Sequence, residues 1–274
     1  MKLNVMKPKI KKPNIKAPKV LKPKQKHSVN KLSEDWRVYF KGNTSVRFDY
    51  GAFKYLFRDL EHTYILTIHY DQQNDLGFPT KEELEKLYLV EDQIEKQWGR
   101  KGFYFVGTRT QDGNRDFVFM SKHIIRWESM CNQLLRNHKD LQSKIVTRLH
   151  DHGKFYQTKL YPDAYGFNWI KNDTIINDLR NQGELFCKAR EIDFYTYFET
   201  NEQAKAFASS LDDVFADIHE LDICEVERKG IQVFVSVVDI PQMDYIMQTT
   251  NALITLAKDH DGEFDGWGTT IEKD

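Results

Sequence analysis

Polar and apolar residues follow two spacings that take turns between residues 36 and 150. Strict alternation over a short run is typical of a half-buried strand, and apolar residues every three to four positions are typical of an amphipathic helix. The alternating runs predict strands at 36–40, 45–48, 64–70, 103–109, 116–120 and 145–150. The helical spacing predicts one helix that begins at Thr80 and a second over 123–137. From residue 64 onward the order is strand–helix–strand–strand–helix–strand, the arrangement of ferredoxin-like folds.

Local signals mark several boundaries of these elements. Thr80 followed by Glu83 predicts a capping box, and Gly99 stands where a left-handed cap ends a helix. The dipeptide Asp112-Gly113 between two strands predicts a tight hairpin. The second helix is expected to bury the face formed by Ile124, Trp127, Met130, Cys131 and Leu134.

The same order of elements recurs in the last third of the chain. Strands are predicted at 192–198, 218–226, 231–238 and 264–271, with helices that begin at Thr200 and at Pro241. The sequence therefore predicts an α+β protein with two ferredoxin-like (βαββαβ) α/β sandwich domains. The expected boundaries are a tail at 1–33, a first domain at 34–160, a connector with a short helix at 161–185, and a second domain at 186–274.

The first 33 residues differ from everything that follows. Residues 7–26 repeat with a period of five, marked by Pro8, Pro13, Pro18 and Pro23. Regular prolines exclude a helix, and repulsion among lysines extends the chain, so a disordered arm is expected. Its lysines are candidate contacts for the phosphates of RNA or another polyanion. These are Lys7, Lys9, Lys11, Lys12, Lys16, Lys19, Lys22, Lys24 and Lys26.

Charge is segregated along the chain although the net charge is only −1. Residues 1–33 hold eleven lysines and no acid, whereas residues 185–274 hold seven basic and nineteen acidic residues. The segment between them is neutral, with 22 residues of each sign. Such an asymmetry concerns partners rather than fold. The arm can therefore bind a polyanion, an anionic lipid surface or the chain's own acidic domain, or it can serve only for solubility.

The cysteine count and the hydropathy indicate the compartment. Cys131, Cys187 and Cys224 are isolated and odd in number, which favours a reducing environment and excludes a disulfide scaffold. No apolar run approaches the ~20 residues of a membrane span. A cytoplasmic protein is expected.

Few residues suggest catalysis. His150 and His152 on a strand share one face, which Asp163 or His138 could join to hold a metal. No third ligand has a fixed spacing, so a polar loop is the favoured interpretation. Glu91 and Asp92 lie about 100° apart on a helix and cannot share one substrate. No catalytic residue, cofactor or metal ligand is assigned, and the chain is expected to be non-enzymatic.

The first domain resembles a bacterial family of domains of unknown function, number six-nine-five. The residues that carry this resemblance are Glu34–Phe40, Leu76–Pro79, Glu91-Asp92 and Val106–Phe117. The resemblance implies no chemistry.

The second domain resembles the regulator of ribonuclease E activity B. The matching parts are Tyr195–Thr200, Val233–Val237 and the motif Gly262–Thr269, which reads Gly-Glu-Phe-Asp-Gly-Trp-Gly-Thr. The resemblance implies an acidic α/β sandwich that binds a ribonuclease and inhibits it without catalysis. Within the motif, the candidate partner contacts are Asp265, Gly266, Trp267 and Gly268.

These observations lead to one preferred function and two alternatives. The preferred function is regulation of a ribonuclease or another RNA-processing protein through the acidic domain. The first alternative is nucleic-acid binding by the lysine arm. The second is a metal-dependent hydrolase centred on His150 and His152.

Overall fold

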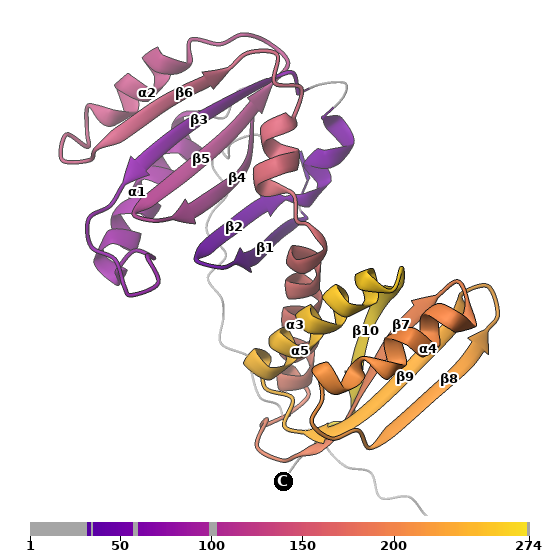
Figure 1. Cartoon of the computed structure of the whole chain (residues 1–274). Helices are drawn as coiled ribbons and strands as arrows, with labels where there is room; N and C mark the ends of the chain where they lie inside the picture. Colours follow the sequence, from indigo (N-terminus) through magenta and orange to yellow (C-terminus); the bar gives the residue numbers. More distant parts are fainter. Residues whose placement is uncertain (1–31, 34, 57–59, 99–102, 273–274) are drawn as a thin grey trace, which may run out of the picture.

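A computed structural model describes residues 32–33, 35–56, 60–98 and 103–272 (Figure 1). The lysine arm, with its nine candidate contacts, and Gly99 lie outside the described residues. The described part has a two-domain layout, with one antiparallel sheet in each half. The prediction of a mixed α/β protein with two domains is confirmed at this level.

The first sheet has six strands in the order β1-β2-β4-β5-β3-β6, and every neighbouring pair is antiparallel. The strands are β1 (Trp36–Lys41), β2 (Thr44–Asp49), β3 (His62–His69), β4 (Phe103–Gln111), β5 (Asn114–Ser121) and β6 (Ser143–Arg148).

Both faces of this sheet are covered. Helices α1 (Lys81–Gln97) and α2 (Trp127–Leu135) pack on one face, where β3 contributes Tyr64, Leu66 and Ile68. The short helical turns η1 (Tyr50–Tyr55) and η2 (Tyr156–Leu160) pack on the other. Burial on both sides explains why residues 62–66 are buried without interruption.

The second sheet has four antiparallel strands in the order β10-β7-β9-β8. They are β7 (Arg190–Phe198), β8 (Glu220–Val226), β9 (Gly230–Asp239) and β10 (Glu263–Thr269). Helices α4 (Asn201–Ser209) and α5 (Met243–Asp259) cover one face, with the turn η3 (Leu211–Asp213) after α4. Within the described ranges, no helix packs on the opposite face.

Helix α3 (Ala164–Asn181) joins the two halves (Figure 1). Asp163 caps it by accepting a 3.0 Å hydrogen bond from the backbone of Gly166. Near its start, Trp169 packs on Phe40 of β1 with 5.1 Å between ring centroids. Near its end, Ile176 and Leu179 belong to the core of the second domain. The expected short connector helix is thus an 18-residue helix that contributes to both cores.

Several local predictions are confirmed. Thr200 with Gln203 forms a complete capping box. At Thr80 only half of the predicted box forms: the Thr80 side chain accepts from the backbone of Glu83, but the Glu83 carboxylate pairs with Lys86 at 2.7 Å. Asp112 and Gly113 have φ values of +47° and +73°, as a tight hairpin turn requires.

Three boundaries were predicted wrongly. Helix α2 begins at Trp127, and Ile124 before it is 64% exposed instead of buried. The backbone N–H of Ile125 donates instead to the Tyr64 hydroxyl, a contact from a distant strand that delays the helix. Helix α5 begins at Met243 with Gln242 as its N-cap, so Pro241 precedes the first turn. Strand β6 ends at Arg148, because the chain turns at His150 with φ of +53°.

A buried ion pair fastens the two ends of the second domain. The Glu184 carboxylate lies 2.7 Å from the Arg190 guanidinium, and their side chains are 1% and 5% exposed. Burial by itself raises the pKa of Glu184, but hydrogen bonds from the backbones of Glu272 and Phe186, together with Arg190, outweigh it and lower the pKa. Arg190 also donates to Thr269, at the end of β10.

Glu184→Gln should destabilise the protein by about 3 kcal/mol at pH 7, because it leaves Arg190 buried without its counter-charge. A carboxylate with a lowered folded pKa contributes stability above its unfolded value of 4.5 and loses it as the pH falls through the folded pKa. The difference from wild type should therefore shrink below pH 4.5. Urea titrations at pH 7 and at acid pH measure it, with exposed Glu199→Gln as the control. If the difference in unfolding free energy between Glu184→Gln and wild type did not change with pH, the ion pair between Glu184 and Arg190 would not be the source of the stability.

Candidate protein interface

A groove with a volume of about 700 Å³ lies where α3, β10 and β1 meet. Residues of both domains line it, and three of them, Asp265, Gly266 and Trp267, belong to the predicted contact motif. The lining residues are Arg37, Asn168, Ile170, Lys171, Asn172, Thr174, Ile175, Tyr195, Asp265, Gly266 and Trp267.

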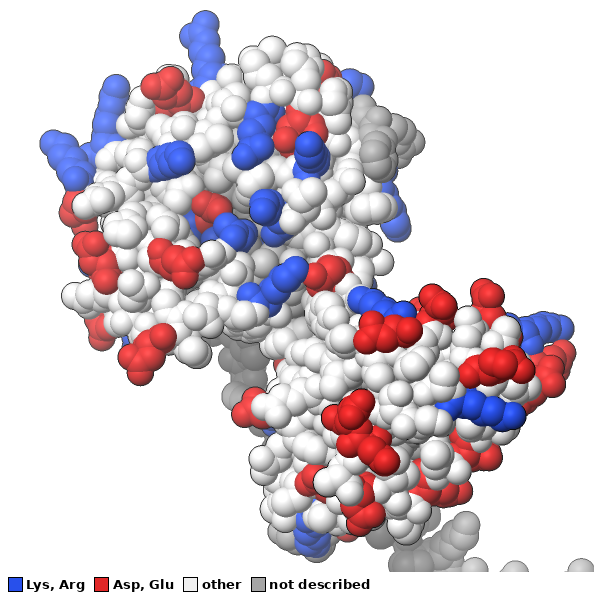
Figure 2. Space-filling view, in the orientation of Figure 1, with Lys and Arg blue, Asp and Glu red and all other residues white. Residues whose placement is uncertain are grey.

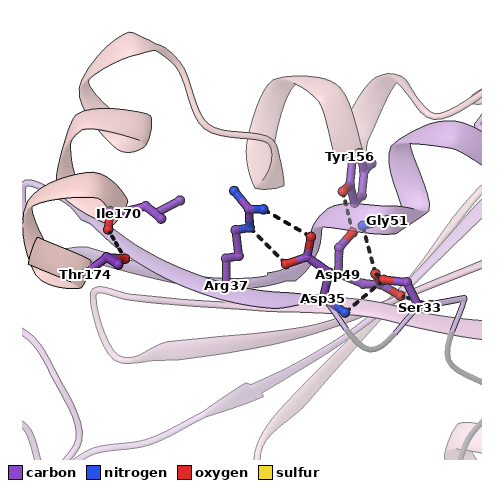
Figure 3. Close-up of polar contacts among 8 residues, drawn as sticks. All are labelled: Ser33, Asp35, Arg37, Asp49, Gly51, Tyr156, Ile170 and Thr174. Atoms are coloured by element: carbon purple, nitrogen blue, oxygen red, sulfur yellow. Dashed lines mark hydrogen bonds and ion pairs between the residues drawn. The ribbon is translucent and has the colours of Figure 1, made fainter. Parts of the chain in front are cut away.

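Arg37 is the residue that the first domain contributes to the lining, and its guanidinium is turned toward Asp35 (Figure 3). Its Nε and Nη2 donate to the Asp35 carboxylate at 2.9 and 3.1 Å. The guanidinium carbon lies 3.8 Å from the centroid of the Tyr50 ring. On the helix side, the Thr174 hydroxyl donates to the carbonyl of Ile170 at 2.8 Å, so it is satisfied within its own helix. Arg37 is held rigidly by an ion pair and a cation–π contact.

A buried carboxylate fixes the segment before Arg37 (Figure 3). The Asp49 carboxylate accepts hydrogen bonds from the backbone N–H groups of Ser33 and Gly51, each at 3.0 Å, and from the Ser33 hydroxyl. The Tyr156 hydroxyl donates to the Asp49 carbonyl at 2.6 Å. Burial raises the pKa of Asp49, although the bonds from Ser33 and Gly51 act against it. The beginning of β1 is thereby tied to η1 and η2.

A chain of buried hydrogen bonds forms the floor of the groove. Trp267 Nε1 donates to Asn172 Oδ1 at 2.8 Å, and Asn172 Nδ2 donates to the Thr250 hydroxyl at 2.9 Å. Asn168 Nδ2 donates to the same hydroxyl at 2.8 Å. Trp267 is 7% exposed, and Asn172 and Thr250 are almost completely buried. The tryptophan therefore anchors β10 to α3 and α5 and offers a partner only its rim.

The glycines of the motif have different environments. A Cβ at Gly262 would lie 2.1 Å from the Phe198 ring, so this position requires glycine for packing. A Cβ at Gly266 or Gly268 would meet nothing within 4 Å. These two residues lie on the helix-free side of β10, opposite Tyr195 and Asp193, beside a bulge in the strand. They leave open surface over the edge of the sheet.

Asp265 sits at this bulge and is exposed. Its carboxylate lies 3.4 Å from Lys229 Nζ, and its carbonyl accepts from Lys171 Nζ at 3.3 Å. A hydrogen bond to the Tyr197 hydroxyl, and then the charge of Asp265, raise the pKa of Lys229. Both lysines therefore contact the bulge in β10.

The helix-free side of the second sheet, called the open face below, joins this edge. Its centre is aromatic: the rings of Tyr195 and Phe234 lie 5.6 Å apart, and Tyr197 follows on the same strand. Carboxylates surround the centre, at Glu191, Asp193, Glu220, Asp222 and Glu263. Figure 2 shows the opposite side of the second domain, which α4 and α5 cover; acidic side chains predominate there too, whereas the first domain shows mixed charge.

The residues that suggested catalysis are placed as follows. Glu91 is buried between Arg47 and Arg115, with 3.0 Å to the latter, while Asp92 is exposed. Asp163 caps α3 and pairs with Lys41 at 2.6 Å. Glu91 and Asp163 therefore have structural partners.

His150 and His152 do come together with a third residue, which is Glu61 and not Asp163 or His138. The sequence carried no signal for Glu61 because it lies almost ninety positions away. The sequence pattern also gave no sign that Asn168 and Asn172 would be buried. Both lie on α3, and which of its sides is buried depends on its packing against both domains.

Comparison with known families now gives these two α/β domains a context. Residues 28–161 match the "Family of unknown function (DUF695)", and residues 169–269 match "Regulator of ribonuclease activity B". Both expected resemblances are thereby confirmed. The second match includes most of α3. No curated protein matches this chain.

Two solved structures are similar over most of their length. One is an unknown protein from Galdieria sulphuraria, with 10% identity, a TM-score of 0.22, and coverage of 76% of this chain and 99% of its own. The other is a putative glycine cleavage system transcriptional repressor, with 11% identity, a TM-score of 0.24, and coverage of 77% and 98%. Scores this low carry no argument about function. No helix in the described ranges is long and apolar enough to cross a membrane.

Trp267→Phe should destabilise the protein by about 1–3 kcal/mol, because it leaves the buried Asn172 carbonyl without a donor. Asn172→Ala removes the other partner of the same bond. The double variant should therefore cost about 1 kcal/mol less than the sum of the single variants. Urea denaturation of the four proteins gives this coupling energy. Strictly additive costs would show that the bond does not hold β10 to α3.

Proposed function

We propose that this protein is a non-catalytic regulator that binds a ribonuclease or another RNA-processing protein through the acidic second domain. The observation that carries the proposal is the match of residues 169–269 to "Regulator of ribonuclease activity B". The net charge of −12 over residues 185–274 supports a binder of a basic partner. A cytoplasmic location is part of the proposal.

The proposal includes the fold of both domains. In the first sheet, β3 lies between β5 and β6, with β4 beyond β5. In the second, β7 lies between β9 and β10, with β8 beyond β9. Both orders fit two ferredoxin-like sandwiches, the first with an added hairpin of β1 and β2. The boundaries 34–160, 161–185 and 186–274 stay a proposal, since α3 contributes to both cores.

The open face is the surface that this proposal assigns to the partner. The first sheet is covered on both sides, whereas no helix among the described residues covers one side of the second sheet. Interfaces are typically aromatic at the centre and polar at the rim. Tyr195, Tyr197 and Phe234 supply such a centre, and the carboxylates around them supply an acidic rim.

The contact motif contributes to this surface in two ways. Trp267 holds β10 in place from the core side, so the strand edge is rigid. Gly266 and Gly268 have no side chains to cover Tyr195 and Asp193, which leaves room for a partner's side chains. Asp265 adds an exposed carboxylate at the bulge. All four predicted contacts are kept in the proposal, with Trp267 as the buried support.

The lysine arm gives the alternative function. It is a candidate for binding RNA or another polyanion, and also for competing with a partner at the acidic domain. Its residues lie outside the described part of the chain. The alternative therefore rests on sequence alone.

When the full chain is used to capture proteins from host lysate, the captured proteins should include a ribonuclease. Adding the protein should lower the activity of that ribonuclease. With that ribonuclease purified, Asp193→Asn/Asp222→Asn should weaken binding about tenfold, equal to about 1.4 kcal/mol. The control Glu202→Gln/Asp213→Asn makes the same change of net charge on α4 and η3 and should bind like wild type. Calorimetric titrations measure both. Equal weakening by the two pairs would mean that net charge, not the open face, determines binding.

Gly268→Leu tests the same surface by bulk. The new side chain meets nothing within 4 Å of its Cβ, so thermal stability should be retained, while the partner should be blocked. Ala206→Leu, on the exposed side of α4, adds a similar side chain away from the open face and should bind normally. Affinity and melting temperature are measured for both variants. A Gly268→Leu protein that is folded and binds as wild type would exclude this edge from the interface.

A further inference from the structure

Three side chains that can bind a metal meet at one end of the first sheet, although Glu61 is almost ninety positions from His150 and His152. Glu61 directly precedes β3, and His150 and His152 lie in the turn that follows β6. Strands β3 and β6 are antiparallel neighbours, with Thr63 opposite Arg148. The end of β6 is therefore placed beside the beginning of β3.

Backbone contacts fix this turn. The His152 N–H donates to the Glu61 carbonyl at 2.9 Å, and the His150 N–H donates to Nδ1 of the buried His62 at 3.1 Å. Between them, the Asp151 carboxylate accepts from the Thr63 hydroxyl at 3.0 Å. Asp151 is thus engaged with β3, while both neighbouring histidines are exposed.

The donor atoms form a compact group. One ligand atom each from Glu61, His150 and His152 lies within 4.8 Å of the others. His150 Nδ1 and a Glu61 oxygen are already 2.5 Å apart. In a tetrahedral zinc site the donor atoms stand roughly 3.3 Å from each other, given metal–ligand distances of about 2.0–2.2 Å. The ligand atoms reach this geometry if they shift by about 1–1.5 Å through side-chain rotation. Both histidines are exposed, so their side chains have room to rotate.

The chemistry of the group selects the cation. Two imidazoles and one carboxylate are the three protein ligands of a common class of zinc site, whose fourth position is left to water. Calcium and magnesium prefer sets made only of oxygen ligands. The buried His62 accepts a hydrogen bond from the backbone of His150 and so fixes the turn that carries both histidines.

We infer that Glu61, His150 and His152 bind one divalent cation of the zinc class, with an open fourth position. The metal takes the place of the proton that His150 and Glu61 otherwise share. The site lies in the first domain, so a test of metal binding there does not depend on the function proposed for the second domain. The simpler possibility is that Glu61 and His150 form only an ion pair.

Calorimetric titration of the full chain, purified without a histidine tag, with zinc chloride tests the inference. Wild type should bind one equivalent, and His152→Asn should weaken binding by at least about tenfold, since even residues behind metal ligands cost 10–100-fold. Asparagine is chosen because it tolerates the positive φ of +48° at this position. Glu61→Gln should weaken binding to a similar degree.

His219→Asn is the matched control. His219 lies 3.3 Å from Glu191, so it reproduces a histidine–carboxylate pair without the third ligand. It should leave zinc affinity unchanged. Cobalt in place of zinc should give tetrahedral visible absorption in wild type and lose it in His152→Asn, with melting curves showing that the variant is folded. Absence of one-equivalent binding, or wild-type affinity in His152→Asn, would reduce the group to an ion pair.

Discussion

One buried hydrogen bond, from Trp267 Nε1 to Asn172 Oδ1, joins the helix between the domains to the edge of the second sheet. Buried polar groups must be paired, so the indole and the amide fix how the helix lies against β10 and α5. The other end of α3 packs on β1 through Trp169. One helix therefore sets the groove between the domains and supports the edge of the second sheet. The motif residues around this edge are arranged by that constraint.

The two sheets differ in how much of their surface is left for a binding partner. Helices and turns occupy both faces of the first sheet, and residues 34–184, which include it, carry no net charge. The second sheet has an open face, and nearly all of the excess negative charge of the folded chain lies in its domain. The lack of a covering helix among the described residues selects the open face, and the carboxylates around its aromatic centre make that face acidic. The first domain supplies one wall of the groove through Arg37 and a separate cluster of ligands at its far end.

Elements governed by neighbouring residues could be predicted from the sequence. The caps at Thr80 and Thr200 and the turn at Asp112-Gly113 form because the partners are only a few positions apart. The start of α2 was missed because Tyr64, from a distant strand, bonds the backbone before it. Glu61 and Asn172 were missed for the same reason: their partners are separated from them by dozens of residues. The motif around Trp267 was recognised, but only the packing separates its buried anchor from its open glycines.

Hydrogen exchange of the full chain, alone and with the bound ribonuclease, tests the central claim most directly. Binding on the open face predicts slower exchange in β8 and β10, whose outer edges would be covered, and unchanged exchange in α4 and the exposed side of α5. Protection confined to α4 and α5, with β8 and β10 unchanged, would place the partner on the helical face. That result would contradict the account given for the second domain.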